Sequence, residues 1–130
     1  PGDHGSTFGG NPLAAAIGLE ALNILVEDEL PQRSAAMGAY LADQLLQIET
    51  PLIREVRGRG LFIGVEIDPA LCSARQVCEM LMERGLLSKE THETVDRLAP
   101  PLIISREEVD WAITQIREVL AEIDKVRLAS

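Results

Sequence analysis

The first regular segment of the chain is apolar in nearly every direction. Over residues 12–28 only Glu20 and Asn23 interrupt the run of apolar residues before its acidic end. Asn11 can cap a helix here and Pro12 can be its first residue, so we expect a helix over this range. A helix that is apolar all round is normally buried on every side. A chain of 130 residues can hardly surround it, and we expect it to pack on parts absent from this chain.

Three later segments have the patterns of helices that cover a core on one side. Ser73 and Gln76 form a capping box for the middle one, and Ser105 and Glu108 form another for the last. The apolar stripes comprise Met37, Leu41, Leu45 and Ile48 within residues 31–48, and Val109, Ile113, Ile116, Leu120 and Ile123 in the last helix. Spacings of three and four predict an amphipathic helix in both.

The apolar period changes to two between these helices. Over residues 61–67 the aliphatic Leu61, Ile63, Val65 and Ile67 alternate with Phe62, Gly64 and Glu66, which predicts a half-buried strand. Residues 53–57 are its expected partner. Residues 86–89 and 94–99 read as two further short strands, and two prolines stop the second. The order predicts an α+β fold, with a small, mainly antiparallel sheet covered by helices on one face.

Composition and charge narrow the function classes. The formal net charge of -9 repels a phosphate backbone, so we expect no nucleic-acid partner. No apolar run reaches the roughly 18 residues of a membrane span, and we expect no membrane partner. Cys72 and Cys78 are six apart in what reads as one helix, where they could not easily bridge. Unpaired cysteines favour a reducing compartment, and we expect a cytoplasmic protein.

The glycine-rich stretch HGSTFGGNP leads directly into the first helix. Backbone amides at a helix N-terminus, with the hydroxyls of Ser6 and Thr7, suit a phosphate or a carboxylate. A plain surface loop leading into a capped helix explains the same residues. From spacing alone the plain loop is favoured.

Arg97 is the second candidate, because a strand projects it to one defined side of the sheet. A bidentate carboxylate clamp is one interpretation, and an ion pair with neighbouring acids is the other. Arg57 and Arg59 could line an anion-binding turn, but a tight turn with two solvated arginines is favoured.

The remaining reactive side chains predict no site. Lys89 and Lys125 read as solvated lysines, and His4 and His92 have no partner at metal-ligand spacing. The two cysteines match no zinc pattern, so no metal site is expected.

The opening stretch, PGDHGSTFGGNPLAAAIGLEALNIL, closely resembles the segment of class III aminotransferases in which the large domain crosses into the C-terminal small domain. EVRGRGLFIGVEI, RGLLSKETHETVDRLAPPLII and the closing helix follow in the order of that family, so the resemblance covers the whole chain. Within the class, KETH followed by RLAPPL looks most like the ornithine aminotransferases. Acetylornithine and 4-aminobutyrate aminotransferases usually differ after the arginine, and they are the alternatives.

The resemblance implies a fold type I homodimer with pyridoxal phosphate (PLP) between its subunits, which moves the δ-amino group of ornithine to 2-oxoglutarate. Thr7 would hydrogen-bond the cofactor phosphate in the neighbouring subunit, and Ser6 would lie beside it near the substrate. Arg97 would bind the α-carboxylate of 2-oxoglutarate or glutamate. Residues 1–30 would be a loop and linking helix from the large domain, and residues 31–130 the small domain.

Two features depart from the family pattern. Asp96 stands where the family usually has an aliphatic residue, and Leu98 where it usually has phenylalanine. Asp96 should point to the opposite sheet face from Arg97, so the clamp should survive. The family's Schiff-base lysine lies upstream of this sequence, so we expect a C-terminal piece of the enzyme that is inactive alone. A free-standing, non-catalytic dimerisation module is the alternative from another class.

Overall fold

The computed structural model describes residues 5–129 and divides the chain into two compact units, one ending at Pro31 and one beginning at Gln32. In the first unit, α1 spans Pro12–Glu27. The Asn11 side chain accepts hydrogen bonds from the backbone N–H groups of Leu13 and Ala14, as its capping role predicts. No residue of α1 is buried, which leaves its apolar side chains without a covering layer in the described part of the chain.

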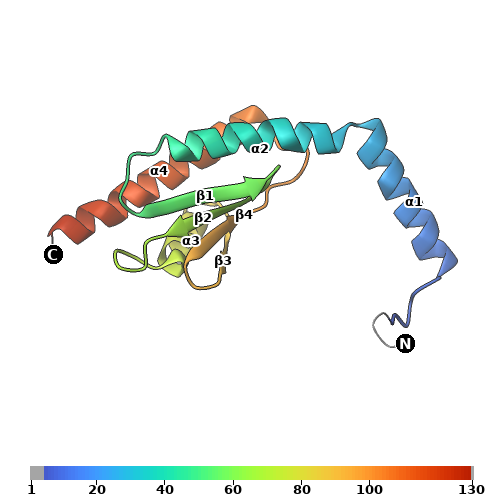
Figure 1. Cartoon of the computed structure of the whole chain (residues 1–130), viewed down its shortest axis with the longest axis horizontal. Coiled ribbons are helices and arrows are strands. Elements are labelled where there is room, and N and C mark those ends of the chain that lie inside the picture. Colours follow the sequence, from blue (N-terminus) through green and yellow to red (C-terminus); the bar gives the residue numbers. More distant parts are fainter. Residues whose placement is uncertain (1–4, 130) are drawn as a thin grey trace. The chain divides into compact units, whose positions relative to one another are not determined.

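The rest of the chain forms three helices and a four-stranded sheet (Figure 1). The elements are α2 (Leu30–Leu46), β1 (Ile53–Arg59), β2 (Phe62–Ile67), α3 (Ala74–Glu83), β3 (Lys89–Thr91), β4 (Val95–Leu98) and α4 (Arg106–Ala129). The strand order is β1-β2-β4-β3, and each neighbouring pair is antiparallel. The predicted α+β class is confirmed. Among the helices of residues 5–129, none is long and apolar enough to cross a membrane.

The three helices of the second unit share one core with one face of the sheet (Figure 1). Alternate residues of β2 supply the sheet side of this core, namely Ile63, Val65 and Ile67. The helices supply Leu41, Leu45, Val77, Leu81, Val109, Ile113, Ile116, Val119, Leu120 and Ile123. The opposite face of the sheet carries Phe62, which is 60% exposed. The helices therefore leave that second face uncovered within the second unit.

The predicted caps form and fix where the helices begin. The Ser105 hydroxyl accepts from the Glu108 N–H at 3.2 Å, and the Glu108 carboxylate accepts from the Ser105 N–H at 2.8 Å, which completes a capping box. The Ser73 hydroxyl accepts from the Gln76 N–H at 3.1 Å. At the other end of α3, Gly85 has a φ of 85°, the left-handed conformation that ends a helix.

A close backbone contact seats α2 on the turn between β1 and β2. A Cβ atom on Gly38 would lie 2.0 Å from the Gly60 carbonyl oxygen, so only glycine fits there. The Ser34 hydroxyl also accepts from the Leu61 N–H at 3.1 Å. Both contacts hold α2 against the β1–β2 hairpin.

Three sequence expectations were wrong in detail. The strand expected over residues 86–89 is β3 at Lys89–Thr91, because the Leu86 N–H bonds to the Leu81 carbonyl and so belongs to the end of α3. The strand expected over residues 53–57 runs on to Arg59, because the hairpin pairing continues to the turn. Cys72 lies before α3 rather than inside it, although both cysteines are free thiols.

Asp96 lies on the helix-covered face of the sheet, opposite to Arg97, as expected. It is 3% exposed, and its Oδ1 accepts from the Cys78 thiol at 3.2 Å. Burial raises the pKa of the Asp96 carboxyl, and the nearby Ser88 and Cys78 side chains only partly offset this. Burial also raises the pKa of Cys78, to about 11. This corner of the core therefore holds an acid and a thiol that both resist ionisation.

The raised pKa of Asp96 predicts a specific pH dependence of stability. The folded-state pKa lies above the unfolded one, so stability falls as the pH rises from about 4 through the folded-state pKa. Asp96→Asn removes the charge and keeps the shape. We expect its free energy of unfolding to exceed that of the wild type by about 1–2 kcal/mol at pH 8, and the gain to vanish near pH 4.

Urea denaturation at both pH values measures this difference. The matched control is Asp43→Asn, which removes an exposed acid from α2 and should leave stability unchanged at both pH values. A lower stability of Asp96→Asn at pH 8 would mean that the ionised carboxylate is stabilising.

Candidate functional site

The uncovered face of the sheet carries a row of cationic residues. Arg57 on β1 pairs with Gly64 on β2, Gly64 pairs with Arg97 on β4, and Arg97 pairs with Lys89 on β3. Directly paired residues of antiparallel strands project from the same face. Three cationic side chains thus share one line across the sheet, which we call the cationic row. Like charges placed directly opposite one another are destabilising unless anions offset them.

Within the cationic row, Arg57 is neutralised by the protein itself. Its guanidinium donates to Glu55 Oε2 at 2.9 Å and to Glu66 Oε2 at 2.8 Å. The hydrogen bond from Arg57, and then that from the Thr94 hydroxyl, hold the pKa of Glu66 below its usual range. The lowered pKa favours the ionised form of Glu66, and Arg57 occupies both carboxylates. Arg57 is exposed, as the turn interpretation expected, but it lies on β1 rather than in the turn and is paired with two acids.

Arg97 has no such acid. No ion pair joins it to any residue within 5–129, and its Nε atom is buried without a hydrogen-bond partner. Its guanidinium carbon lies 5.6 Å from the centre of the Phe62 ring, close enough for a cation–π contact. A buried donor without a partner costs free energy, and an anion would remove that cost.

A hollow of about 360 Å³ lies beside Arg97 on this face. Its lining consists of Arg57, Gly58, Phe62, Gly64, Thr91, Val95 and Arg97. Gly64 sits between the two arginines, and a Cβ atom there would approach Val95 Cγ1 to 3.1 Å. Val95 therefore fills the space that a side chain at position 64 would need, and the hollow beside Arg97 is large enough for a ligand of carboxylate size.

The predicted loop residues lie in the first unit. Ser6 and Thr7 are exposed in a turn in which the Gly9 N–H bonds to the Ser6 carbonyl at 3.3 Å. Neither hydroxyl has a hydrogen-bond partner among residues 5–129, so both can donate outward. The first amides of α1 are already taken by Asn11. The loop can therefore offer its hydroxyls to a phosphate, whereas the Leu13 and Ala14 amides of α1 are already bonded to Asn11.

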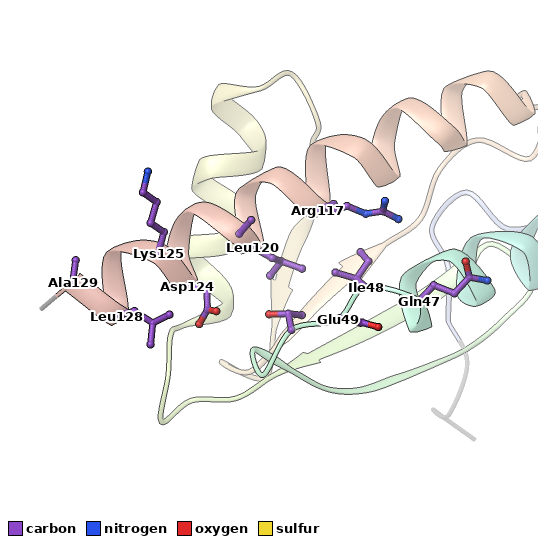
Figure 2. Close-up of a pocket in the computed structure, with 11 residues that line it drawn as sticks. Gln47, Ile48, Glu49, Arg117, Leu120, Asp124, Lys125, Leu128 and Ala129 are labelled. Carbon is purple, nitrogen blue, oxygen red and sulfur yellow. The ribbon is translucent and has the colours of Figure 1, made fainter.

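A larger hollow, of about 750 Å³, lies elsewhere (Figure 2). Its side chains come from α4 and from the segment after α2, among them Arg117, Asp124, Lys125 and Glu49. None of the predicted site residues lines it, and no strand of the sheet contributes to it. It mixes both charges without a built set of polar contacts, so we do not assign it as the site.

Lys89 belongs to the cationic row, and the other candidates stay without a role. Lys89, Lys125 and His92 are exposed, and His4 lies outside the described residues. Within residues 5–129 no group of histidine, cysteine and acidic side chains could hold a metal ion.

Comparison with known proteins decides the family. The model of the aminotransferase class-III family matches residues 1–120. The chain belongs to the class III aminotransferases. Members of this class use PLP, and their substrates are amino acids and keto acids. The resemblance carried by HGSTFGGNPLA and RLAPPL is thus confirmed.

The most similar relatives include ornithine aminotransferases. That of an Exiguobacterium species is 60% identical over 121 residues, which are 93% of this chain and 30% of the relative. Ornithine aminotransferase 2 of Staphylococcus aureus is 60% identical over 92% of this chain and 29% of the relative. The chain therefore spans about 30% of the length of these relatives.

Solved structures agree with this placement. An ornithine aminotransferase from Toxoplasma gondii, which has partial occupancy of PLP at its active site, superimposes with a TM-score of 0.87 at 42% identity. This match covers 98% of this chain and 30% of that one. An acetylornithine aminotransferase from Elizabethkingia anophelis has a TM-score of 0.82 at 38% identity, over 94% of this chain and 33% of that one.

Sequence reasoning found Arg97 but missed what surrounds it. Phe62 and Gly64 were placed on the second face of a strand without a role, and Thr91 was given no role. The alternation of residues 61–67 contains the signal, because it puts Phe62 and Gly64 on one face. Only the pairing of β2 with β4 shows that this is also the face of Arg97.

Proposed function

We propose that this chain is the C-terminal part of an ornithine aminotransferase. The complete enzyme transfers the δ-amino group of ornithine to 2-oxoglutarate, giving glutamate semialdehyde and glutamate. The observation that carries the proposal is Arg97, an unpaired arginine with a buried Nε beside a hollow on the uncovered sheet face. The 60% identity to ornithine aminotransferases supports the choice of amino donor.

Arg97 binds the α-carboxylate of 2-oxoglutarate, and of glutamate in the reverse direction. Its planar guanidinium can donate two parallel hydrogen bonds to one carboxylate, which fixes the orientation of the keto acid as well as its charge. Phe62 holds the guanidinium at one edge of the hollow. Arg57 cannot serve equally well, because Glu55 and Glu66 already occupy its donors.

Thr7 binds the phosphate of PLP in the neighbouring subunit of a homodimer, and Ser6 lies beside it near the substrate. Their exposed hydroxyls, which have no hydrogen-bond partner among residues 5–129, fit this role. PLP, when bound, supplies the electron sink for amino transfer. Its Schiff-base lysine belongs to the large domain that we propose precedes this chain, and the chain alone is inactive.

The protein works in the cytoplasm, where a reducing environment keeps both Cys72 and Cys78 as thiols. Residues 1–30 link the large domain to the small domain formed by residues 31–130.

Acetylornithine is the competing amino donor, since the Elizabethkingia anophelis structure is also similar. We expect the full-length enzyme to have a kcat/KM for ornithine at least about tenfold above that for N-acetylornithine, because one pocket must accommodate either a free or an acetylated α-amine. Initial rates with each donor and saturating 2-oxoglutarate measure the ratio. A preference for N-acetylornithine would assign the enzyme to the alternative.

Arg97→Lys tests the carboxylate clamp. Lysine keeps the charge but loses the planar fork, so we expect transition-state stabilisation toward 2-oxoglutarate to fall by about 2–4 kcal/mol. The measurement is kcat/KM for 2-oxoglutarate in the full-length enzyme, with PLP content checked by absorbance and expected to be unchanged. Kinetics close to the wild type would show that Arg97 is not the clamp.

The role of Thr7 predicts complementation between subunits. One full-length variant lacks the Schiff-base lysine, and another carries Thr7→Asp, whose carboxylate repels the phosphate. Each homodimer should be nearly inactive. In a mixed dimer one site combines an intact lysine with an intact Thr7, so activity should return to roughly half of the wild type per dimer, as two-fold symmetry requires.

Differently tagged subunits allow the mixed dimer to be purified and assayed against both parents. If Thr7 and the lysine serve the same site within one chain, both sites of the mixed dimer are damaged and its activity stays at the level of the parents.

A further inference from the structure

Thr91 is a buried polar group that the function proposed above does not use. Its Oγ1 atom is inaccessible to solvent and has no hydrogen-bond partner. It lines the same hollow as Arg97. A hydroxyl buried without a partner lowers the stability of the fold, so such groups are rare unless a ligand satisfies them.

The sheet register places Thr91 beside Arg97 on the uncovered face. Thr91 pairs with Val95, and Val95 lies two residues before Arg97 on the same strand and the same face. Thr91 and Arg97 are therefore diagonal neighbours, typically about 7–8 Å apart. One carboxylate can bridge this gap, because each of its hydrogen bonds spans about 2.8 Å.

The neighbouring side chains leave Thr91 without an alternative acceptor. Glu66 lies across the sheet from Thr91, because both residues pair with Val95. Its Oε1 already accepts from the Thr94 hydroxyl at 2.8 Å, and its Oε2 accepts from Arg57 at 2.8 Å. Lys89 lies on the same strand and face as Thr91 and offers no acceptor. Within residues 5–129 the Thr91 hydroxyl and Arg97 Nε are buried donors without a hydrogen-bond partner, and both residues line one hollow.

We propose that Thr91 is a specificity-determining residue that donates a hydrogen bond from Oγ1 to the keto-acid carboxylate bound by Arg97. This inference rests on the proposed function. Arg97 supplies charge and orientation, and Thr91 supplies a second, fixed donor from β3. Lys89, paired across from Arg97, adds positive potential that attracts the anion.

Thr91→Val in the full-length enzyme tests the proposal, since valine keeps the shape and removes the hydroxyl. We expect KM for 2-oxoglutarate to rise about tenfold, the effect of losing a hydrogen bond to a charged group. The kcat value and KM for ornithine should stay within about twofold. Thr91→Ser, which retains the donor, should recover most of the affinity for 2-oxoglutarate.

The matched control is Thr94→Val, which removes a hydroxyl of the same hairpin that is already bonded to Glu66. It should leave KM for 2-oxoglutarate within about twofold of the wild type. Thermal unfolding of each variant checks folding, and Thr91→Ala replaces Thr91→Val if the latter does not fold.

Two results would overturn the role of Thr91. One is an unchanged KM for 2-oxoglutarate in Thr91→Val. The other is a rise in KM that is equal for 2-oxoglutarate and ornithine and that Thr91→Ser does not reverse. A purely structural role of Thr91 would produce that result. If Arg97→Lys lowers kcat/KM for 2-oxoglutarate while Thr91→Val leaves KM for 2-oxoglutarate unchanged, only the role of Thr91 is contradicted. If both variants behave as the wild type, the proposed carboxylate site fails as well.

Discussion

The antiparallel register between β2 and β4 decides which side chains meet on each face of the sheet. Pairing of Gly64 with Arg97 places the glycine of β2 beside the arginine, and pairing of Val65 with Asp96 directs the acid into the core. A slip by one residue would exchange the two faces. It would bury the guanidinium under the helices and present a carboxylate to the ligand. The core therefore protects the site, because residues such as Ile63 and Val65 hold the register by their burial.

The contrast between Arg57 and Arg97 shows how one sheet face distinguishes two arginines. They lie in the same cross-strand row with Gly64 between them. Arg57 has two carboxylates within 3 Å, at 2.9 and 2.8 Å, whereas Arg97 has an aromatic ring and a buried, unpartnered Nε. An arginine whose donors are bonded to protein carboxylates helps to join neighbouring strands. An arginine with an unused donor can instead bind a ligand. Charge alone does not separate the two, but the distribution of acids around them does.

Much of this fold could be predicted from the sequence, because its signals are local. Asn11 and Ser105 marked helix starts, and alternation over residues 61–67 marked the central strand. Prediction failed where one residue fits two elements. The apolar side chain of Leu86 suggested the start of a strand, but its N–H bonds to the Leu81 carbonyl at the end of α3. It also failed where contacts depend on strands distant in sequence. Thr91 and Phe62 are 29 positions apart by number, and nothing local shows that they line one hollow with Arg97.

The first unit has a different relation to function. Helix α1 has no buried residue, and its apolar side chains Leu13, Ile17 and Leu22 are each at least 60% exposed. Apolar surface of this extent normally marks an interface, and the chain spans only about 30% of its relatives' length. We infer that the rest of the enzyme covers this helix and thereby places Ser6 and Thr7. In the function proposed above, the hydroxyl loop and the arginine site belong to a larger active site that the rest of the enzyme completes.

A crystal structure of the full-length enzyme with bound 2-oxoglutarate tests the central claim most directly. The account predicts a keto-acid carboxylate within hydrogen-bond distance of the Arg97 guanidinium, with Arg57 still paired to Glu66. An Arg97 paired to a protein carboxylate, with the keto acid bound away from the uncovered face of the sheet, would contradict it.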